Sequence, residues 1–170
     1  MIDLSNTDAA IRVIVALLVG AAIGLEREWR NKPAGLRTYA LVCEGSALFM
    51  IGAILLYDDV QRAGGTTADP SRIGSTVVQG VGFLAAGVIF TAGSKVHGLT
   101  TAAGIWVTSA LGLLVGAGFY EVALLGGALT LITLSAFRVV ERYIPNDSNA
   151  TKRRDRASGE DHPQSSDPAL

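Results

Sequence analysis

The sequence predicts an all-α integral membrane protein: a bundle of five transmembrane helices followed by a disordered polar tail. Hydrophobic residues make up 49% of the 170-residue chain. Its charged residues gather at a few places, which long apolar runs separate. A soluble domain spreads its charges along every amphipathic helix, whereas segregated charges are typical of membrane spans.

Five apolar runs supply the predicted spans, at about residues 9–25, 39–57, 73–90, 99–115 and 120–137. Each is slightly shorter than the roughly 20 residues that cross a bilayer core. Together they form one predicted transmembrane domain over residues 1–145. Residues 146–170 have no apolar period and are rich in Asp, Ser, Pro, Lys and Arg, so we expect a disordered tail there.

The residues that flank the first predicted span indicate where its helix begins and ends. Glu26 and Arg30 are four residues apart, which favours a first helix that continues beyond the membrane until Pro33 ends it. The residues before this helix include Asp3 and Asp8 rather than basic residues. We therefore expect no secretory signal, and a first helix that is retained.

Residues 79–104 are mostly apolar and crowded with Gly, Ala and Thr, and the pattern predicts two spans joined by a tight turn at residues 93–98. Small residues let membrane helices approach closely, because their association depends on packing. The glycines expected at such contacts are Gly20, Gly24, Gly80, Gly82, Gly87 and Gly98.

Basic residues predict the orientation. Five spans divide them into a group of eleven and a group of three, and the basic-rich side is normally cytoplasmic. We therefore expect an external N-terminus and a cytoplasmic C-terminus in a bacterial inner membrane. The larger group is Arg27, Arg30, Lys32, Arg37, Lys95, Arg138, Arg142, Lys152, Arg153, Arg154 and Arg156, and the smaller is Arg12, Arg62 and Arg72.

Glu44 is the one carboxylate well inside a predicted span. A charge there costs about 2.5–3.5 kcal/mol on insertion scales, so it should face the bundle, with Arg37 or Arg27 as its partner. It either binds a cation or proton, or is a hydrogen-bonded structural residue. Glu26, Arg27 and Arg37 border the same face, where they close the mouth of the bundle or only anchor the topology.

Three further polar residues, Gln79, Thr100 and Thr101, lie near the central hairpin. The threonines are candidates to cap the fourth span, but interhelical hydrogen bonding is the favoured interpretation. Three external acids, Asp58, Asp59 and Asp69, offer only a weak divalent-cation signal, and a solvated loop is favoured.

The sequence gives no support to several classes of function. The sequence has no nucleophile–base pair, phosphate-binding loop or zinc-ligand spacing, so we expect no enzyme and no cofactor, and we assign no metal site. No concentrated basic face indicates nucleic acid. The single cysteine, Cys43, excludes an internal disulfide.

Four motifs together resemble the MgtC/SapB family of bacterial inner-membrane proteins. They are GAAIGLER at 20–27, AGLRT at 34–38, GVGFLAAG at 80–87, and GLTTAA at 98–103 with Ile105 and Trp106 following. The resemblance covers about residues 10–140. Glu44 departs from the family pattern, which has an apolar or small residue at that position.

The resemblance implies a role in adaptation to low magnesium, with virulence-associated members in pathogens. It also implies action on other membrane proteins such as the rotary ATP synthase. The best-described member carries a folded cytoplasmic C-terminal domain; only a short tail follows here, so no role of that domain is carried over. Two functions remain open: a regulatory membrane protein, and a small transporter or channel for a cation such as magnesium, or for a small solute. The partners expected are the lipid bilayer, other inner-membrane proteins and a second copy in a homo-oligomer, since five short helices enclose little interior.

Overall fold

The computed structural model describes residues 4–65, 69–93 and 95–143, with side chains up to residue 136. The chain divides into two compact units, residues 1–134 and 135–170. All packing reported below belongs to the first unit. The predicted tail, residues 146–170, lies outside the described residues.

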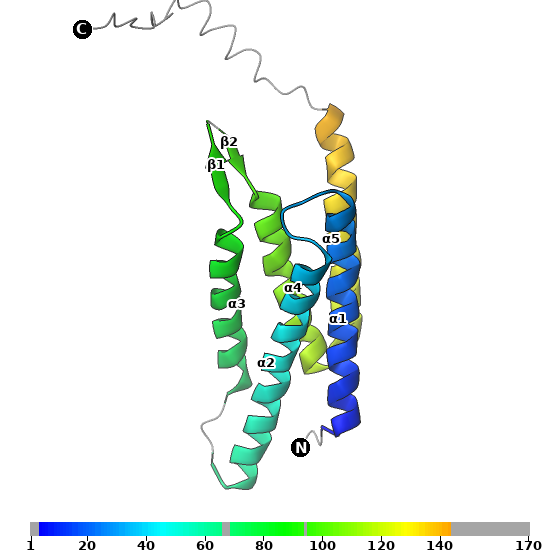
Figure 1. Ribbon diagram of the computed structural model, residues 1–170. Helices are drawn as coiled ribbons and strands as arrows, with labels where there is room; N and C mark the ends of the chain where they lie inside the picture. The colour runs from blue at the N-terminus through cyan, green and yellow to red at the C-terminus, as the bar shows by residue number, and fades with distance from the viewer. Residues whose placement is uncertain (1–3, 66–68, 94, 144–170) are drawn as a thin grey trace, which may run out of the picture. The chain divides into compact units, whose positions relative to one another are not determined.

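The described residues form five helices and one short β-hairpin. The elements are α1 (Asn6–Trp29), α2 (Leu36–Arg62), α3 (Pro70–Ala86), β1 (Phe90–Ala92), β2 (Lys95–His97), α4 (Leu99–Ala117) and α5 (Tyr120–Tyr143). In the first unit, successive helices run in alternating directions (Figure 1). The hairpin lies at the end where α1 stops and α2 starts, which we call the hairpin end; α2 stops and α3 starts at the opposite end.

Three helices, α1, α2 and α4, are long and apolar enough to cross a membrane. Helix α3 has 17 residues, and the apolar part of α5, Tyr120–Ala136, is also shorter. The sequence thus predicted the helices in the correct number and order among the described residues. Five membrane crossings stay a prediction.

The connection between α3 and α4 differs from the prediction. The third span was expected to reach residue 90, but α3 ends at Ala86, and β1 pairs antiparallel with β2, with Phe90 opposite His97. Gly87 favours a helix end, and the β-branched and aromatic residues that follow favour a strand. Gly98, at φ 87°, then turns the chain into α4, in a backbone region that suits glycine.

Local hydrogen bonds set the helix ends. The Ser5 side chain accepts the Asp8 N–H at 3.1 Å at the start of α1. At its end Asn31 has φ 52°, and the Lys32 N–H reaches the Arg27 carbonyl at 3.1 Å. This left-handed cap ends α1 before Pro33, the residue expected to stop it.

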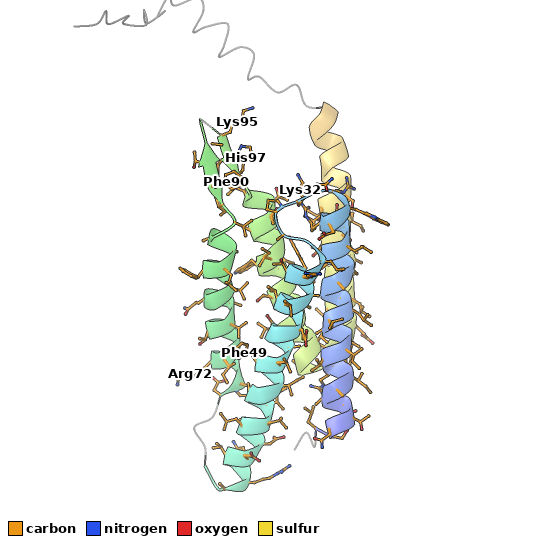
Figure 2. The ribbon with its side chains drawn as sticks, in the orientation of Figure 1. Lys32, Phe49, Arg72, Phe90, Lys95 and His97 are labelled. Atoms are coloured by element: carbon orange, nitrogen blue, oxygen red, sulfur yellow. The ribbon has the colours of Figure 1, made fainter. Side chains whose placement is uncertain are left out.

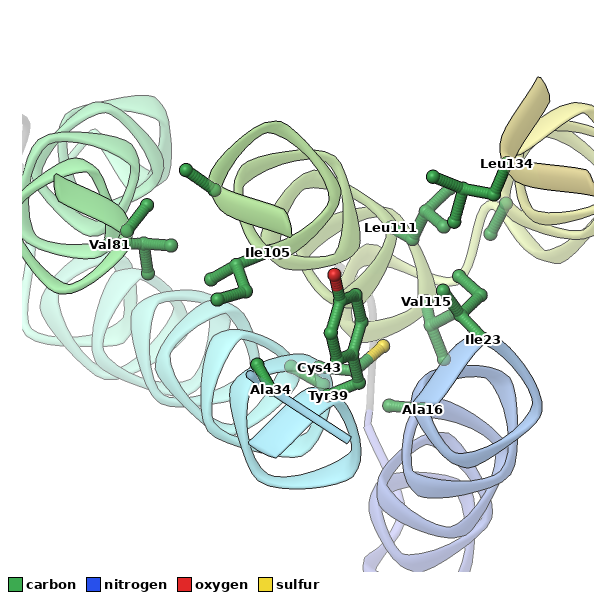
Figure 3. Packing of buried hydrophobic residues seen from close by; sticks show 14 residues of the cluster. Ala16, Ile23, Ala34, Tyr39, Cys43, Val81, Ile105, Leu111, Val115 and Leu134 are labelled. Carbon is green, nitrogen blue, oxygen red and sulfur yellow. The ribbon is translucent and has the colours of Figure 1, made fainter. Parts of the chain in front are cut away.

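The core lies where α1, α2 and α4 meet. Tyr39 and Cys43 of α2 point between α1 and α4, and Ile23, Ile105 and Val115 pack around them (Figure 3). Small residues make this possible at close backbone contacts, among them those of Gly20, Gly24 and Gly116. A methyl group on Gly20 would lie 2.5 Å from the Tyr39 carbonyl oxygen, one on Gly24 2.7 Å from the Leu36 Cα, and one on Gly116 2.6 Å from the Ala47 carbonyl oxygen.

The glycines of α3 do not pack as expected. A methyl group on Gly80 or Gly82 would meet no atom within 4 Å, and one on Gly87 would approach only the Leu84 carbonyl of its own helix. The reason is the direction of α3, which buries Val81 and Ala85 instead. Among the described residues, Gly20 and Gly24 of α1 pack closely on α2 as predicted, and Gly98, just before α4, lies close to the Val88 backbone.

Candidate functional site

The main candidate site is a charged cluster at the end of α1. Arg27 is only 3% exposed, and its Nη1 lies 3.5 Å from Glu26 Oε2. Arg30, one turn later, also pairs with Glu26. A buried charge is tolerated when an opposite charge compensates it, so this cluster depends on Glu26. The sequence placed both residues at this end but did not predict that Arg27 is buried.

A buried hydrogen bond joins helices α2 and α4 at the same end of the unit. The buried Tyr39 hydroxyl donates to the Thr101 carbonyl oxygen at 3.1 Å and so links α2 to the first turn of α4. Glu26 and Arg27 lie near the end of α1, at the same end of the unit as this hydrogen bond. Polar contacts on α1, α2 and α4 therefore gather at the hairpin end.

Glu28 has a role that the sequence analysis missed. Its Oε2 accepts the Leu36 N–H at 3.0 Å and so caps the start of α2 across the loop. Gly35, the residue before α2, offers no side-chain cap of its own. The only signal in the sequence was a carboxylate shortly before a glycine that precedes a helix, which is too general to single out one partner.

Glu44 lacks the expected arginine partner. Its side chain is half-buried on α2, and no hydrogen bond or ion pair joins it to any residue that the structure describes. Arg27 is held by Glu26, while Arg37 is exposed and lies seven residues, or about 10 Å, away along the helix. The predicted pairing of Glu44 with Arg27 or Arg37 is therefore wrong for the described part of the chain.

The other predicted polar residues do not share one environment. Thr101 is buried and offers its backbone carbonyl to Tyr39, whereas Thr100 is exposed. Neither side chain caps α4, whose start is formed by Gly98. Gln79 is exposed on α3 and makes no hydrogen bond to another described residue.

Arg12 forms a second polar link, at the opposite end. Its Nη1 donates to the Gly116 carbonyl oxygen at 2.7 Å and ties α1 to the last turn of α4. A cation is favoured there by the partial negative charge of a helix C-terminus. The sequence suggested only an interfacial arginine, since the pairing joins residues 104 positions apart.

An open apolar groove of about 710 Å³ runs between α2 and α3. Residues 41–49 of α2 and 73–84 of α3 line it, and Phe49 lies about halfway between the two ends (Figure 2). The groove carries almost no polar atoms, so it suits acyl chains or an apolar helix face rather than a hydrated ion. No cluster of three or more His, Cys, Asp or Glu residues with the spacing of a metal site occurs in the described ranges.

Comparison with known proteins places the chain in a family. The model of the MgtC family matches residues 13–143, which is most of the chain. The chain belongs to the MgtC family. With the three long apolar helices, membership shows a membrane protein. The resemblance inferred from the four sequence motifs is confirmed.

Named relatives of the MgtC family are similar over the helical region. "Putative magnesium transporter YhiD" of Escherichia coli K12 is 48% identical over 127 residues, which cover 75% of this chain and 59% of YhiD. Protein SrpB of Synechococcus elongatus is 43% identical over 141 residues, 78% of this chain and 76% of SrpB. Protein MgtC of Salmonella typhimurium LT2 is 42% identical over 126 residues, 74% of this chain and 49% of MgtC. No solved structure matches the chain.

Proposed function

We propose that this chain is a regulatory protein of the bacterial inner membrane that acts on other membrane proteins through its helix faces. The observation that carries this proposal is the closed interior of the first unit. Tyr39, Cys43, Ile105 and Val115 fill the junction of α1, α2 and α4. The buried charges of Glu26 and Arg27 are held against each other at one end. Such a core holds helices together and offers little room for a solute.

The proposed topology has five crossings, with the N-terminus outside and the C-terminus in the cytoplasm. Lys32 and Lys95 both lie at the hairpin end, and Arg72 lies toward the opposite end (Figure 2). Arg27, Arg30 and Arg37 belong to the hairpin end as well. This distribution supports a cytoplasmic hairpin end by the positive-inside rule.

A role in adaptation to low magnesium is part of the proposal. It is supported by family membership and by the name of YhiD, a relative with 48% identity over its aligned part. Because the chain covers 59% of YhiD and 49% of MgtC, functions of those whole proteins come to this chain only as proposals. The rotary ATP synthase is the candidate target that the family resemblance supplies.

Transport of a cation or small solute is the alternative, and the name of YhiD is what favours it. In that case Glu44, which has no partner among the described residues, is the acid best placed on a path. A path through one copy would have to displace the packed side chains of the core, so a transporter would need an opening between copies.

Two measurements on purified protein separate these functions. In liposomes loaded with a magnesium-sensitive dye, we expect no protein-dependent magnesium entry. In inverted inner-membrane vesicles, added protein should reduce ATP-driven proton pumping, because the proposed target is the ATP synthase. Magnesium entry that scales with protein content, without any effect on pumping, would favour transport and end the regulatory proposal.

A further inference from the structure

Glycines keep the groove between α2 and α3 open. Gly45 of α2 and Gly80 of α3 both line it, and a methyl group on either would meet no atom within 4 Å. At the end away from the hairpin the two helices come closer, since a methyl group on Gly74 would lie 3.6 Å from Met50 Cε. Glycine weakens a helix interior, and close packing among the described residues does not explain Gly45 or Gly80. The space that they leave is therefore the feature to explain.

The groove is about as long as one leaflet of a bilayer is thick. Its α2 wall runs from Leu41 to Phe49, or about 12 Å, and its α3 wall from Ile73 to Leu84, or about 16 Å. Half of a bilayer core measures about 15 Å. Leu41 and Phe49 are 66% and 62% exposed, and Phe49 lies about halfway between the two ends of the unit (Figure 2). An acyl chain of one leaflet fits this length and this apolar lining.

An arginine borders the groove at the hairpin end. Arg37 precedes Leu41 by four residues, so both lie on the same side of α2. The Arg37 side chain is exposed and forms no hydrogen bond or ion pair with any residue that the structure describes. The Glu28 carboxylate reaches the start of α2 but accepts the Leu36 N–H. The exposed Thr38 adds a hydroxyl next to Arg37 in the chain, so this end of the groove offers a cation and a hydrogen-bond donor.

The opposite end of the groove carries charges of both signs. Arg72 precedes Thr76, a groove residue of α3, by one turn. Asp69 lies three residues before Arg72, and its carboxylate accepts the Ser71 N–H at 2.9 Å. Because α2 and α3 run in opposite directions, Arg37 and Arg72 lie at opposite ends of the groove. The excess of positive charge therefore lies at the hairpin end, beside an apolar channel that narrows away from it.

We propose that an anionic phospholipid from the leaflet at the hairpin end occupies this groove, with its phosphate on Arg37 and Thr38 and an acyl chain between α2 and α3. This goes beyond the proposed function and rests only on the proposed membrane crossing of the two helices. A guanidinium forms charge-assisted hydrogen bonds with phosphate, and a threonine hydroxyl can donate another. An apolar helix of a second copy would also fill the groove, but it would bring no opposite charge to Arg37.

Native mass spectrometry of the purified chain in detergent, with phosphatidylglycerol added, tests the headgroup contact. We expect one tightly bound lipid per chain, and weaker binding of phosphatidylcholine with the same acyl chains. Arg37→Gln should weaken the binding of phosphatidylglycerol about fivefold, the change expected for one basic residue near an anionic lipid surface. Arg72→Gln is the matched control and should leave binding unchanged. Equal losses in the two variants would overturn the proposal.

Filling the groove tests the acyl-chain contact. Gly80→Leu and Gly45→Leu should each reduce lipid binding at least tenfold, and the second variant serves if the first fails to fold. Gly82→Leu is the control, because Gly82 also has open space around it but does not line the groove. Several lipids bound with equal affinity in all variants would show only a general lipid coat and overturn the proposal. Loss of a dimer in Gly80→Leu with unchanged lipid binding would assign the groove to a second copy and overturn it as well.

Reagent access tests the membrane crossing separately, in a Cys43→Ala background. Arg72→Cys should react with an impermeant maleimide from outside the cell, and Lys95→Cys should react only in inverted vesicles. Reaction of both from one side would refute the crossing of α3, and with it both the proposed topology and the placement of the lipid. With the crossing intact, absence of a bound phosphatidylglycerol would overturn the lipid site alone and leave the proposed function standing.

Discussion

Arg27 shows how one side chain in this fold depends on its neighbour. It is almost completely buried, and Glu26 is the carboxylate that holds it. Arg37, only ten residues further, is an exposed arginine without such a partner in the described structure. The two arginines belong to neighbouring family motifs and look equivalent in the sequence, but only Arg27 is buried and therefore needs a compensating charge.

Arg27→Leu should lower the free energy of unfolding by about 3 kcal/mol, because it leaves Glu26 in a largely buried position with only Arg30. Arg37→Leu is the matched control and should change stability by less than about 0.5 kcal/mol. Thermal unfolding in detergent compares the two. The double variant Glu26→Gln with Arg27→Leu should be more stable than Arg27→Leu alone; equal losses in Arg27→Leu and Arg37→Leu would contradict the assigned role of burial.

The substitution Glu44→Gln tests which of the two proposed functions is correct, because it removes the charge of this side chain and changes its shape very little. The carboxylate has no partner among the described residues, so the substitution should leave the folded protein and its thermal stability unchanged. A regulatory protein should then still support growth in low magnesium. A folded Glu44→Gln protein that fails to support growth would show that the carboxylate carries a cation or a proton, and would favour transport.

At the scale of elements, close contacts between helices depend on where a glycine points. Gly116→Ala should destabilise the protein, because the new methyl group would lie 2.6 Å from the Ala47 carbonyl oxygen of α2. Gly52→Ala on the open face of α2 should instead stabilise it by about 0.5–1 kcal/mol, since alanine suits a helix interior better than glycine. Unfolding in detergent gives both values. Equal effects of the two substitutions would mean that α4 does not approach α2 so closely.

The start of α3 should depend on pH through Asp69. Hydrogen bonds from Ser71, through its side chain and its backbone N–H, lower the pKa of the Asp69 carboxyl below its ordinary value of 3.8. A group with a lowered folded-state pKa stabilises the fold above its ordinary pKa, and this contribution is lost as pH falls through the lowered value. Hydrogen exchange of the first turn of α3, corrected for the intrinsic rate, should therefore rise at pH 3 relative to pH 5. Asp69→Ala should remove this difference, and an unchanged difference would assign it to another group.

The helices were easier to predict than their contacts. Apolar runs bounded by Pro33, Pro70 and the charges near residues 26–37 were enough to place five helices in order. The end of α3 was missed, because Val88–Phe90 continue the apolar run while their β-branched and aromatic side chains favour a strand. Periodicity reports the amount of apolar surface, but over so few residues it does not distinguish a short strand from the last turn of a helix.

The candidate site was only partly predictable, for a related reason. The motif at residues 20–27 indicated Glu26 and Arg27, but which arginine is buried depends on the direction of α1 relative to α2. The bond from Arg12 to Gly116 and the cap by Glu28 join residues that no local pattern connects. Gly20 and Gly80 look equally suited to packing in the sequence, and only their neighbours differ.

At the scale of the whole molecule, polar contacts at both ends hold a largely apolar middle. Arg12 joins α1 to α4 at one end, and Tyr39 joins α2 to α4 at the other. Between them the described helices contact each other mainly through glycine, alanine and aliphatic side chains. In membrane helices, polar groups near the ends commonly lie where water and lipid headgroups meet, so this arrangement is compatible with a membrane span between them.

The orientation of this molecule in the membrane is the last prediction. If the hairpin end is cytoplasmic, a reporter that is active only in the cytoplasm should be active when fused after Asn146. A reporter that is active only outside should be active in the loop at residues 64–68, which connects α2 to α3 at the opposite end. The physical reason is the excess of basic residues at the hairpin end. Replacing Lys32 and Lys95 by Gln should weaken this preference. Replacing Arg12 should instead change stability rather than orientation, because its side chain donates a hydrogen bond to the Gly116 carbonyl oxygen. Opposite reporter activities would show that the chain inserts against its basic residues.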